Sequence, residues 1–484
     1  MAASQASPPS PPNLQQSEET TSKAGIAAIG IHFPKILLPK PERVDFERWA
    51  VVACDQYTSE EDYWQRVEQF VGGCPSTLRL TFPEVYLDKG NDDEIISGIT
   101  SSMKAYESEA LFEETTTHGV VLVERTFRDG VRRRGLVLAL DLDLYEFTPG
   151  NAAPIRATEQ TIEERIPPRL KVRRAAALEL PHIIVLIDDA DCTVVEQLAH
   201  CCNDSCNLAY DTDLMEKSGH IKGWWIDDQS ALRLLSDNLS RLADPVAFNQ
   251  RYGTSSKPPL VLAVGDGNHS LATAKALWEE TKKRISAEGG DFLHHPARFA
   301  LVEIQNCHDP SLRFEPINRL IFNVNGGGQG LLEDLVAAFN ASGEGPVVIS
   351  EGDCAYEVAT SDIGREGLGA VSSSASFGYV LKGKKGSVTI PRPKKVLPVA
   401  SLTDFVDDWL SKHPESKIDY VHETTAIDRH CAPQDDFNIG FVLAPMNKRD
   451  LFKTVVFDGI LPRKTFSMGQ VRPRIKPSTL NPSP

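Results

Sequence analysis

Short apolar runs alternate along this chain with segments of helical periodicity, the pattern of strands that alternate with helices. Apolar runs predict strands over 120–127, 135–145, 181–187, 260–264 and 299–305. Helical periodicity predicts helices over 92–108, 231–244, 271–286, 331–340 and 401–412. The turn signal Arg128-Asp129-Gly130 joins the first two strands, and a second hairpin is expected over 379–390. We therefore expect an α/β protein of mixed α+β character, with mixed sheets and flanking helices.

The ends of the chain differ in composition from its middle. Residues 1–24 are rich in Ser, Pro, Gln, Glu and Thr, which predicts a disordered N-terminal tail. We expect an N-terminal α/β region over 25–250, a C-terminal α/β region over 251–470 and a flexible tail over 471–484. The Gly/Ser-rich stretch 343–369 is expected to be irregular. The body is then two-lobed.

The most informative stretch is the junction between an apolar run and a predicted helix. The run Leu260–Val264 meets Gly265-Asp266-Gly267-Asn268-His269-Ser270, and the helical pattern follows at once. Ligands of open α/β sheets bind outside the carboxyl ends of strands, and a helix N-terminus favours anions. An ordinary helix cap would need one of these polar residues. Because four lie within five positions, we favour a binding or catalytic site.

A similar junction occurs earlier in the chain. Trp49–Ala53 resembles a short buried strand, and an acidic helix start follows at Ser59. We expect Asp55 and Tyr57 to be exposed between them. A purely structural turn explains the same pattern equally well.

Arginines gather between residues 156 and 174, beside hydroxyl-bearing residues such as Thr161. Guanidinium groups grip phosphate or carboxylate oxygens in pairs, so Arg156, Arg165 and Arg169 are candidates to bind an anion. A solvated helix with Glu/Arg pairs is the alternative.

Net charge and cysteine content disfavour some classes of protein. The 484-residue chain carries a net charge of −16, which disfavours a large nucleic-acid interface. The sequence contains no run long enough to span a membrane, and its nine scattered cysteines suit a reduced, cytoplasmic protein. The cluster His200-Cys201-Cys202 with Cys206 fits no standard zinc spacing, so we assign no metal ligands.

Several stretches together resemble a known family. They lie in order between residues 30 and 470: Leu37–Lys40, Trp49–Tyr57, Pro75–Leu78, Pro83–Leu87, Arg156–Asp188, Gly265–Lys275 and Leu461–Gly469. On these residues the chain resembles domain-of-unknown-function family 1015, in particular its clostridial-type branch. The Asp-Gly-x-His element also resembles, more distantly, the ParB/sulfiredoxin-like superfamily, which includes free serine kinases. That resemblance implies a ParB/sulfiredoxin-like element in which Asp266–His269 hold nucleotide phosphates.

The chain departs from the family pattern at three places. Serine stands at Ser270 where many members have arginine, although the clostridial branch has serine. Asn318 stands where histidine is usual, and the C-terminal tail is replaced by Gln470–Pro473. If the usual histidine is catalytic, this chain would be altered in activity.

The leading hypothesis is a small-molecule phosphotransferase of the serine-kinase type, which would use ATP or ADP with Mg²⁺. Asp266, Asp55 or Glu159 could accept a substrate proton or help hold magnesium, and His269 could be a general base. The expected nucleotide contacts are Gly265, Gly267, Asn268, Ser270, Arg156, Thr161, Arg165, Arg169 and Lys464. The partner would be a small, hydroxyl-bearing molecule. The alternatives are a hydrolase or other biosynthetic enzyme with the same anion-binding loop, and a non-catalytic nucleotide-binding or interaction protein.

Overall fold

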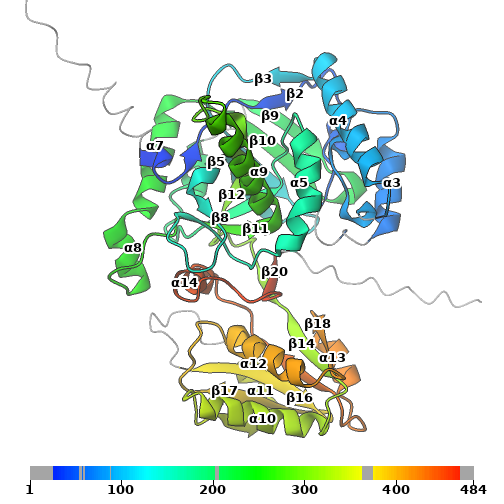
Figure 1. Ribbon diagram of the computed structural model, residues 1–484, viewed down its shortest axis with the longest axis vertical. Coiled ribbons are helices and arrows are strands. Elements are labelled where there is room, and N and C mark those ends of the chain that lie inside the picture. Colours follow the sequence, from blue (N-terminus) through cyan, green and yellow to red (C-terminus); the bar gives the residue numbers. More distant parts are fainter. Residues whose placement is uncertain are drawn as a thin grey trace, which may run out of the picture. The chain divides into compact units, whose positions relative to one another are not determined.

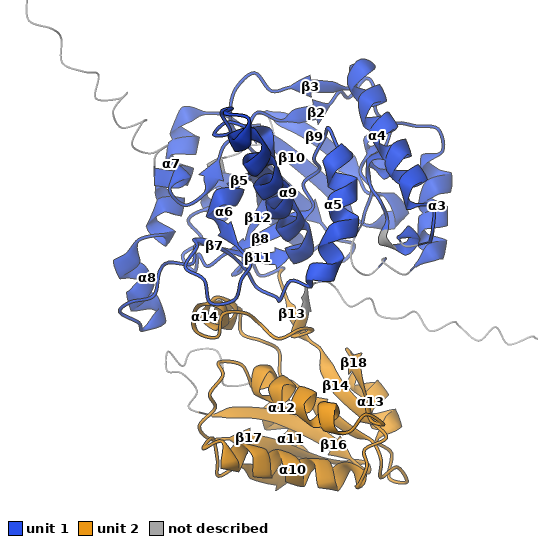
Figure 2. Cartoon of the chain, viewed as in Figure 1, with its two compact units in different colours: residues 1–311 blue, residues 312–484 orange. Residues whose placement is uncertain are grey.

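The computed structural model describes residues 25–53, 57, 60–87, 89–201, 207–361 and 374–468 (Figure 1). The chain divides into two compact units, residues 1–311 and 312–484 (Figure 2). The sequence suggested a boundary near residue 250. The observed boundary lies later because residues 262–266 and 299–306 form central strands of the sheet of unit 1.

A ten-stranded mixed sheet forms the centre of unit 1 (Figure 1). Its order is β6-β7-β11-β8-β12-β5-β4-β10-β9, and β1 pairs with β5. The pairs β6/β7, β7/β11 and β8/β12 are parallel, and the other pairs are antiparallel. The strands are β1 (Ile31–His32), β4 (Val120–Thr126), β5 (Arg132–Asp141), β6 (Tyr145–Glu146), β7 (Ile155–Ala157), β8 (Ile183–Ile187), β9 (Leu208–Asp213), β10 (His220–Ile226), β11 (Leu262–Asp266) and β12 (Phe299–Asn306).

The main core of unit 1 lies on one face of this sheet. Successive side chains of a strand point to opposite faces, so Ala300, Val302 and Ile304 of β12 share a face, and all three are 0% exposed. They join one hydrophobic cluster with residues of helices α6 (Val195–Cys201), α7 (Gln229–Leu242) and α9 (Asn268–Ala287). The long helix α9 therefore rests on the sheet through Leu271, Ala274 and Trp278.

The remaining helices of unit 1 are α2 (Phe46–Trp49), α3 (Glu61–Val71), α4 (Asp92–Ser108), α5 (Ile166–Ala175) and α8 (Pro245–Tyr252). Short 3-10 turns are η2 (Thr77–Leu80), η3 (Glu84–Tyr86), η4 (Leu142–Leu144), η5 (Glu163–Arg165), η6 (Met215–Lys217) and η7 (Pro296–Arg298), and β2 (Leu37–Pro39) pairs with β3 (Phe112–Glu114). Helix α5 lies beside α9, and the Arg174–Glu280 ion pair (2.8 Å) links them (Figure 1).

Two expectations for residues 49–57 were wrong. The apolar residues 49–53 form the end of α2 and a coil instead of a strand. Tyr57 is buried, since its ring stacks on Tyr63 at 3.7 Å, and its carbonyl accepts a hydrogen bond from Trp64. It is therefore a core residue and is not exposed at a site.

Unit 2 contains a six-stranded antiparallel sheet of order β15-β17-β16-β19-β14-β18 and a separate β13/β20 pair. Its strands are β13 (Phe314–Pro316), β14 (Asn318–Phe322), β15 (Val348–Glu351), β16 (Ala375–Leu381), β17 (Lys384–Ile390), β18 (Lys417–Val421), β19 (Ile439–Val442) and β20 (Phe466–Met468). Its helices are α10 (Gly327–Ala341), α11 (Asp353–Thr360), α12 (Pro398–Lys412), α13 (Thr424–His430) and α14 (Lys448–Phe457).

Unit 2 corrects two further expectations. The stretch 343–369 is not irregular throughout, because β15 and α11 form within it. Helix α12 begins at Pro398, before the predicted start at residue 401.

The mixed α/β class with mixed sheets is confirmed, as are the hairpins β4/β5 and β16/β17 and helix α4. Within the described residues, no helix is both long and apolar enough to cross a membrane.

Candidate functional site

Two parallel strands of unit 1 carry the candidate loops to the same edge of the sheet. In the β7/β11 pair Ala157, the last residue of β7, lies opposite Val264, and β11 continues to Asp266. The loop after β7 begins with Thr158, whereas Gly265 and Asp266 end β11 and Gly267 follows them. The glycine loop and the start of the arginine-rich segment are therefore neighbours in space, joined by hydrogen bonds between residues 107 and 110 positions apart in the chain.

Helix α9 begins directly after Gly267, whose left-handed φ of 83° turns the chain from strand to helix. A Cβ at Gly267 would lie 3.1 Å from Cγ1 and 3.3 Å from Cα of Ile183, so both the conformation and the space favour glycine. The N-cap position is Gly267, which has no side chain, and the Asp266 carboxylate accepts the Gly267 N–H at 2.7 Å. The simple helix-cap explanation of the polar cluster is wrong.

Asn268 connects the two loops. This residue is 6% exposed, and its Oδ1 accepts the backbone N–H of Thr158 at 3.1 Å. Its Nδ2 donates to the Thr158 hydroxyl at 3.4 Å, and that hydroxyl donates to the Val264 carbonyl at 2.5 Å. Buried polar groups that are fully hydrogen-bonded fix a single arrangement, so Asn268 positions the two loops.

His269 forms a second connection between the same loops. Its Nε2 accepts the backbone N–H of Ile162 at 3.2 Å. In a neutral imidazole with Nε2 as acceptor, the proton is on Nδ1. His269 thus holds the start of the arginine-rich segment in place, and Nε2 is engaged in this conformation.

Arg156 lies in the interior of the protein. It is 4% exposed, and its guanidinium donates to the carbonyls of Ala153 (2.7 Å), Pro258 (3.1 Å) and Pro259 (3.3 Å). Burial lowers the pKa of Arg156 to about 10. These contacts tie the segments that precede β7 and β11 together, a structural role that the sequence did not indicate.

The other predicted residues of the arginine-rich segment lie closer to solvent. Arg165 is exposed at the end of η5, and Arg169 is half-buried in α5, where it donates to the Arg165 carbonyl at 3.2 Å. Thr161 is 9% exposed, and its buried hydroxyl makes no hydrogen bond among the described residues. Glu159 and Ser270 are half-buried.

Two predicted site residues, and the family departure Asn318, do not belong to the described part of unit 1. Asp55 lies outside the described residues. Lys464 belongs to unit 2, where it precedes β20 with a φ of 56°. Asn318, also in unit 2, is 2% exposed and links three strands, because Nδ2 donates to the His422 carbonyl (3.3 Å) and Oδ1 accepts the Leu443 N–H (3.0 Å).

Sequence reasoning missed Thr158 and Ile162 as partners of the glycine loop. Thr158 directly follows β7, whose three residues Ile155–Ala157 include an arginine and give no clear strand signal. That β7 pairs with β11 could not be read from local periodicity.

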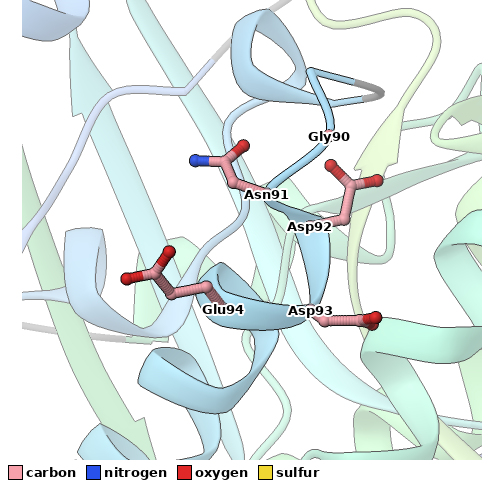
Figure 3. A pocket seen from close by; sticks show the side chains of 5 residues that line it. All are labelled: Gly90, Asn91, Asp92, Asp93 and Glu94. Atoms are coloured by element: carbon pink, nitrogen blue, oxygen red, sulfur yellow. The ribbon is translucent and has the colours of Figure 1, made fainter.

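A hollow of about 570 Å³ lies elsewhere in unit 1, at the start of α4. Figure 3 shows the side chains of Asn91, Asp92, Asp93 and Glu94 pointing in different directions around this turn. Asp93 forms an ion pair with Lys171. Acidic side chains stabilise the positive end of a helix dipole, so this hollow has the character of a solvated helix start.

Comparison with solved structures finds only remote likeness. A free serine kinase variant in complex with AMP has 10% sequence identity and a TM-score of 0.33, with 68% of this chain and 86% of that chain covered. A conserved hypothetical protein from Pyrococcus furiosus has 9% identity and a TM-score of 0.31, with 69% and 90% covered. C-terminally truncated SbnI from Staphylococcus aureus has 10% identity and a TM-score of 0.30, with 69% and 83% covered.

Comparison with curated proteins finds no match. The family model described as "protein of unknown function (DUF1015)" matches residues 33–407, which include both loops of the candidate site and the first strands of unit 2. The chain therefore belongs to the DUF1015 family.

Proposed function

We propose that unit 1 is a small-molecule phosphotransferase that binds ATP or ADP with Mg²⁺ and acts on a hydroxyl-bearing metabolite. One observation carries the proposal: the N-terminus of α9, which begins after Gly267, meets the loop after β7 at one edge of the sheet. Backbone N–H groups at a helix start bind phosphate oxygens, and Gly265 and Gly267 allow close approach. A ParB/sulfiredoxin-like element and a clostridial-type relationship are part of this proposal.

The residues of the site divide into positioning and chemical groups. Asn268 and His269 hold the loops through hydrogen bonds, and Arg156 joins the segments that precede the two strands. Arg165 and Arg169 supply positive charge near a bound phosphate, and the Thr161 and Ser270 hydroxyls are further donors. Phosphoryl transfer depends mainly on such positioning and charge neutralisation.

Asp266 is the preferred acceptor of the substrate proton or magnesium ligand, with Glu159 as the second candidate. Asp266 ends β11 at the start of α9, where the helix N-terminus lies. His269 is less suited to accept a proton, because its Nε2 already accepts the Ile162 N–H.

Isothermal titration of the full chain with Mg²⁺ and ATP, ADP or inorganic phosphate tests the binding step. We expect a nucleotide to bind and Arg165→Ala to weaken it by about tenfold, the loss for one charge-assisted hydrogen bond. Arg284→Ala is the matched control, since Arg284 lies in the last turn of the same helix α9. The proposal fails if no nucleotide binds, or if both variants weaken binding equally.

Turnover separates the enzyme from a non-catalytic binder. Incubation with Mg²⁺, nucleotide and a panel of hydroxy amino acids should yield a phosphorylated product. Asp266→Asn should remove product formation while nucleotide still binds. Binding without any turnover would favour the nucleotide-binding protein, and binding of inorganic phosphate alone would favour an enzyme of another class.

A further inference from the structure

A second group of chemically active side chains lies where β8 and β12 end. These strands are parallel, with Asn306 opposite Ile187, so the residues that follow them meet at one edge. Asp188 follows β8, and Cys307 and His308 follow β12. Because β8 runs antiparallel to β11, this edge is opposite the one that carries the glycine loop. The second group is therefore separate from the proposed nucleotide site.

Three different donor atoms converge here. One carboxylate oxygen of Asp188, the Cys307 thiol sulfur and one His308 ring nitrogen all lie within 4.8 Å of one another. Asp188 is 6% exposed and Cys307 is 0% exposed, whereas His308 is partly open to solvent. The group is thus a buried triangle with one accessible corner.

The surrounding structure orients these donors. Oδ1 of Asp188 contacts His308 Nε2 at 2.6 Å, while Oδ2 accepts the Tyr252 hydroxyl and lies 3.6 Å from Arg251 Nη1. These contacts of Oδ2 fix the orientation of the Asp188 carboxylate, so that only Oδ1 is available to a ligand. On the other side, the buried Asn306 accepts the His308 backbone N–H at 3.1 Å.

A cluster of acidic residues lies beside Asn306, the residue before Cys307. Asp189, Glu196 and Asp309 lie around Cys192 and Asn306; burial and then these carboxylates raise the pKa of the Cys192 thiol. Oε2 of Glu196 is buried without a hydrogen bond among the described residues. Arg251, the positive group that contacts Asp188, is exposed.

We propose that Asp188, Cys307 and His308 bind a zinc ion, with water as the fourth ligand. Carboxylate, thiolate and imidazole together suit this borderline-soft cation, and tetrahedral sites with three protein ligands keep one open position. Two ligand atoms that each lie 2.0–2.3 Å from a tetrahedral zinc ion are ~3.3–3.8 Å from each other. His308 Nε2 and Asp188 Oδ1, now 2.6 Å apart, would therefore move ~0.7 Å further apart on binding zinc. The Cys307 thiol loses its proton to solvent on binding, and His308 binds through an unprotonated Nε2.

An Asp188–His308 ion pair without metal is the competing explanation. It accounts for the 2.6 Å contact and makes no use of the Cys307 sulfur as a ligand, although that sulfur lies in the same triangle. The two explanations differ in one respect that can be measured, which is whether Cys307 becomes a metal ligand.

The test uses the full chain, loaded with zinc and then dialysed against metal-free buffer. Elemental analysis should find about one zinc per chain. Cys307→Ser should lose the metal, whereas Cys431→Ser should keep it, because Cys431 is equally buried and lies in unit 2. Tyr252→Phe, a positioning variant, should weaken zinc binding by about tenfold. Cobalt in place of zinc should give a thiolate-to-metal absorption band that Cys307→Ser removes and Cys431→Ser keeps.

Circular dichroism of each variant checks folding, and His308→Ala answers the same question if Cys307→Ser does not fold. Retention of zinc by both ligand variants, or absence of zinc and of the cobalt band in the wild type, would overturn the proposal. These readouts require neither nucleotide nor turnover, so they are independent of the proposed phosphotransferase activity.

Discussion

At the scale of single residues, Gly267 combines two requirements that can be separated experimentally. Its φ of 83° disfavours any side chain, and Ile183 occupies the space that a Cβ would need. Gly253 ends α8 with a φ of 64°, but nothing lies within 4 Å of a Cβ there. The two glycines therefore differ mainly in the second requirement.

We expect Gly267→Ala to lower the free energy of unfolding by about 2–4 kcal/mol and Gly253→Ala by about 1–2 kcal/mol. The difference between the two losses measures the cost of the contact with Ile183. Urea denaturation followed by circular dichroism measures each loss. Equal losses would show that Ile183 moves aside without cost.

Asn268 is the residue on which the geometry of the two loops depends most directly. Asn268→Ala leaves the Thr158 N–H buried without its acceptor, which costs about 1–3 kcal/mol. Urea denaturation should show this loss, and titration should show weaker nucleotide binding. Gln160→Ala, an exposed change in the same segment, should leave both properties unaltered. A stable Asn268→Ala protein would remove this residue from the positioning role.

At the scale of elements, α9 is fixed to the sheet by more than its apolar side chains. Asp143 in η4 accepts hydrogen bonds from Lys282 and from the buried Trp278, both at 2.7 Å. Burial raises the pKa of Asp143, but these hydrogen bonds outweigh it, so its pKa lies below the ordinary value. Helix and turn are thus joined by an ionised carboxylate.

The ionised Asp143 carboxylate should make the stability of the protein depend on pH. A carboxyl group with a depressed folded pKa contributes stability above the unfolded value of about 3.9, and the contribution is lost as pH falls through the lower folded value. We expect Asp143→Asn to cost about 1–3 kcal/mol at neutral pH and progressively less below about pH 4. Urea denaturation across this range measures the effect. The exposed Asp191→Asn is the control, and a deficit independent of pH would contradict the prediction.

Elements differed in how well the sequence predicted them. The central strands β8, β11 and β12 were predicted because each begins with an apolar run. Trp49–Ala53 has similar local composition, yet Asp45 caps α2 by accepting the Glu47 and Arg48 N–H groups. Packing of Trp49 against Tyr106 and Phe112 then uses these apolar side chains without a strand.

At the scale of the whole molecule, each unit has a hydrophobic core of its own. Trp278 is fully buried in unit 1, and Phe441 is fully buried in unit 2, where it packs against Phe377 at 5.8 Å. Removing either aromatic side chain costs about 3–5 kcal/mol.

We therefore expect differential scanning calorimetry to resolve two components. Trp278→Ala should lower the midpoint of one component, and Phe441→Ala should lower that of the other. A single transition shifted equally by both substitutions would contradict this independence.

The sequence by itself determined the mixed α/β class, the central strands and the chemistry of the Gly265–Ser270 loop. These features follow from local periodicity, turn residues and residue type. Tertiary structure decided which distant segments meet: β7 beside β11, Asn268 on Thr158, and Asp188 beside His308. Arg156, which the sequence predicted to contact phosphate, is instead buried and donates hydrogen bonds to backbone carbonyls. Strand pairing and burial depend on residues more than a hundred positions apart, which no local pattern encodes.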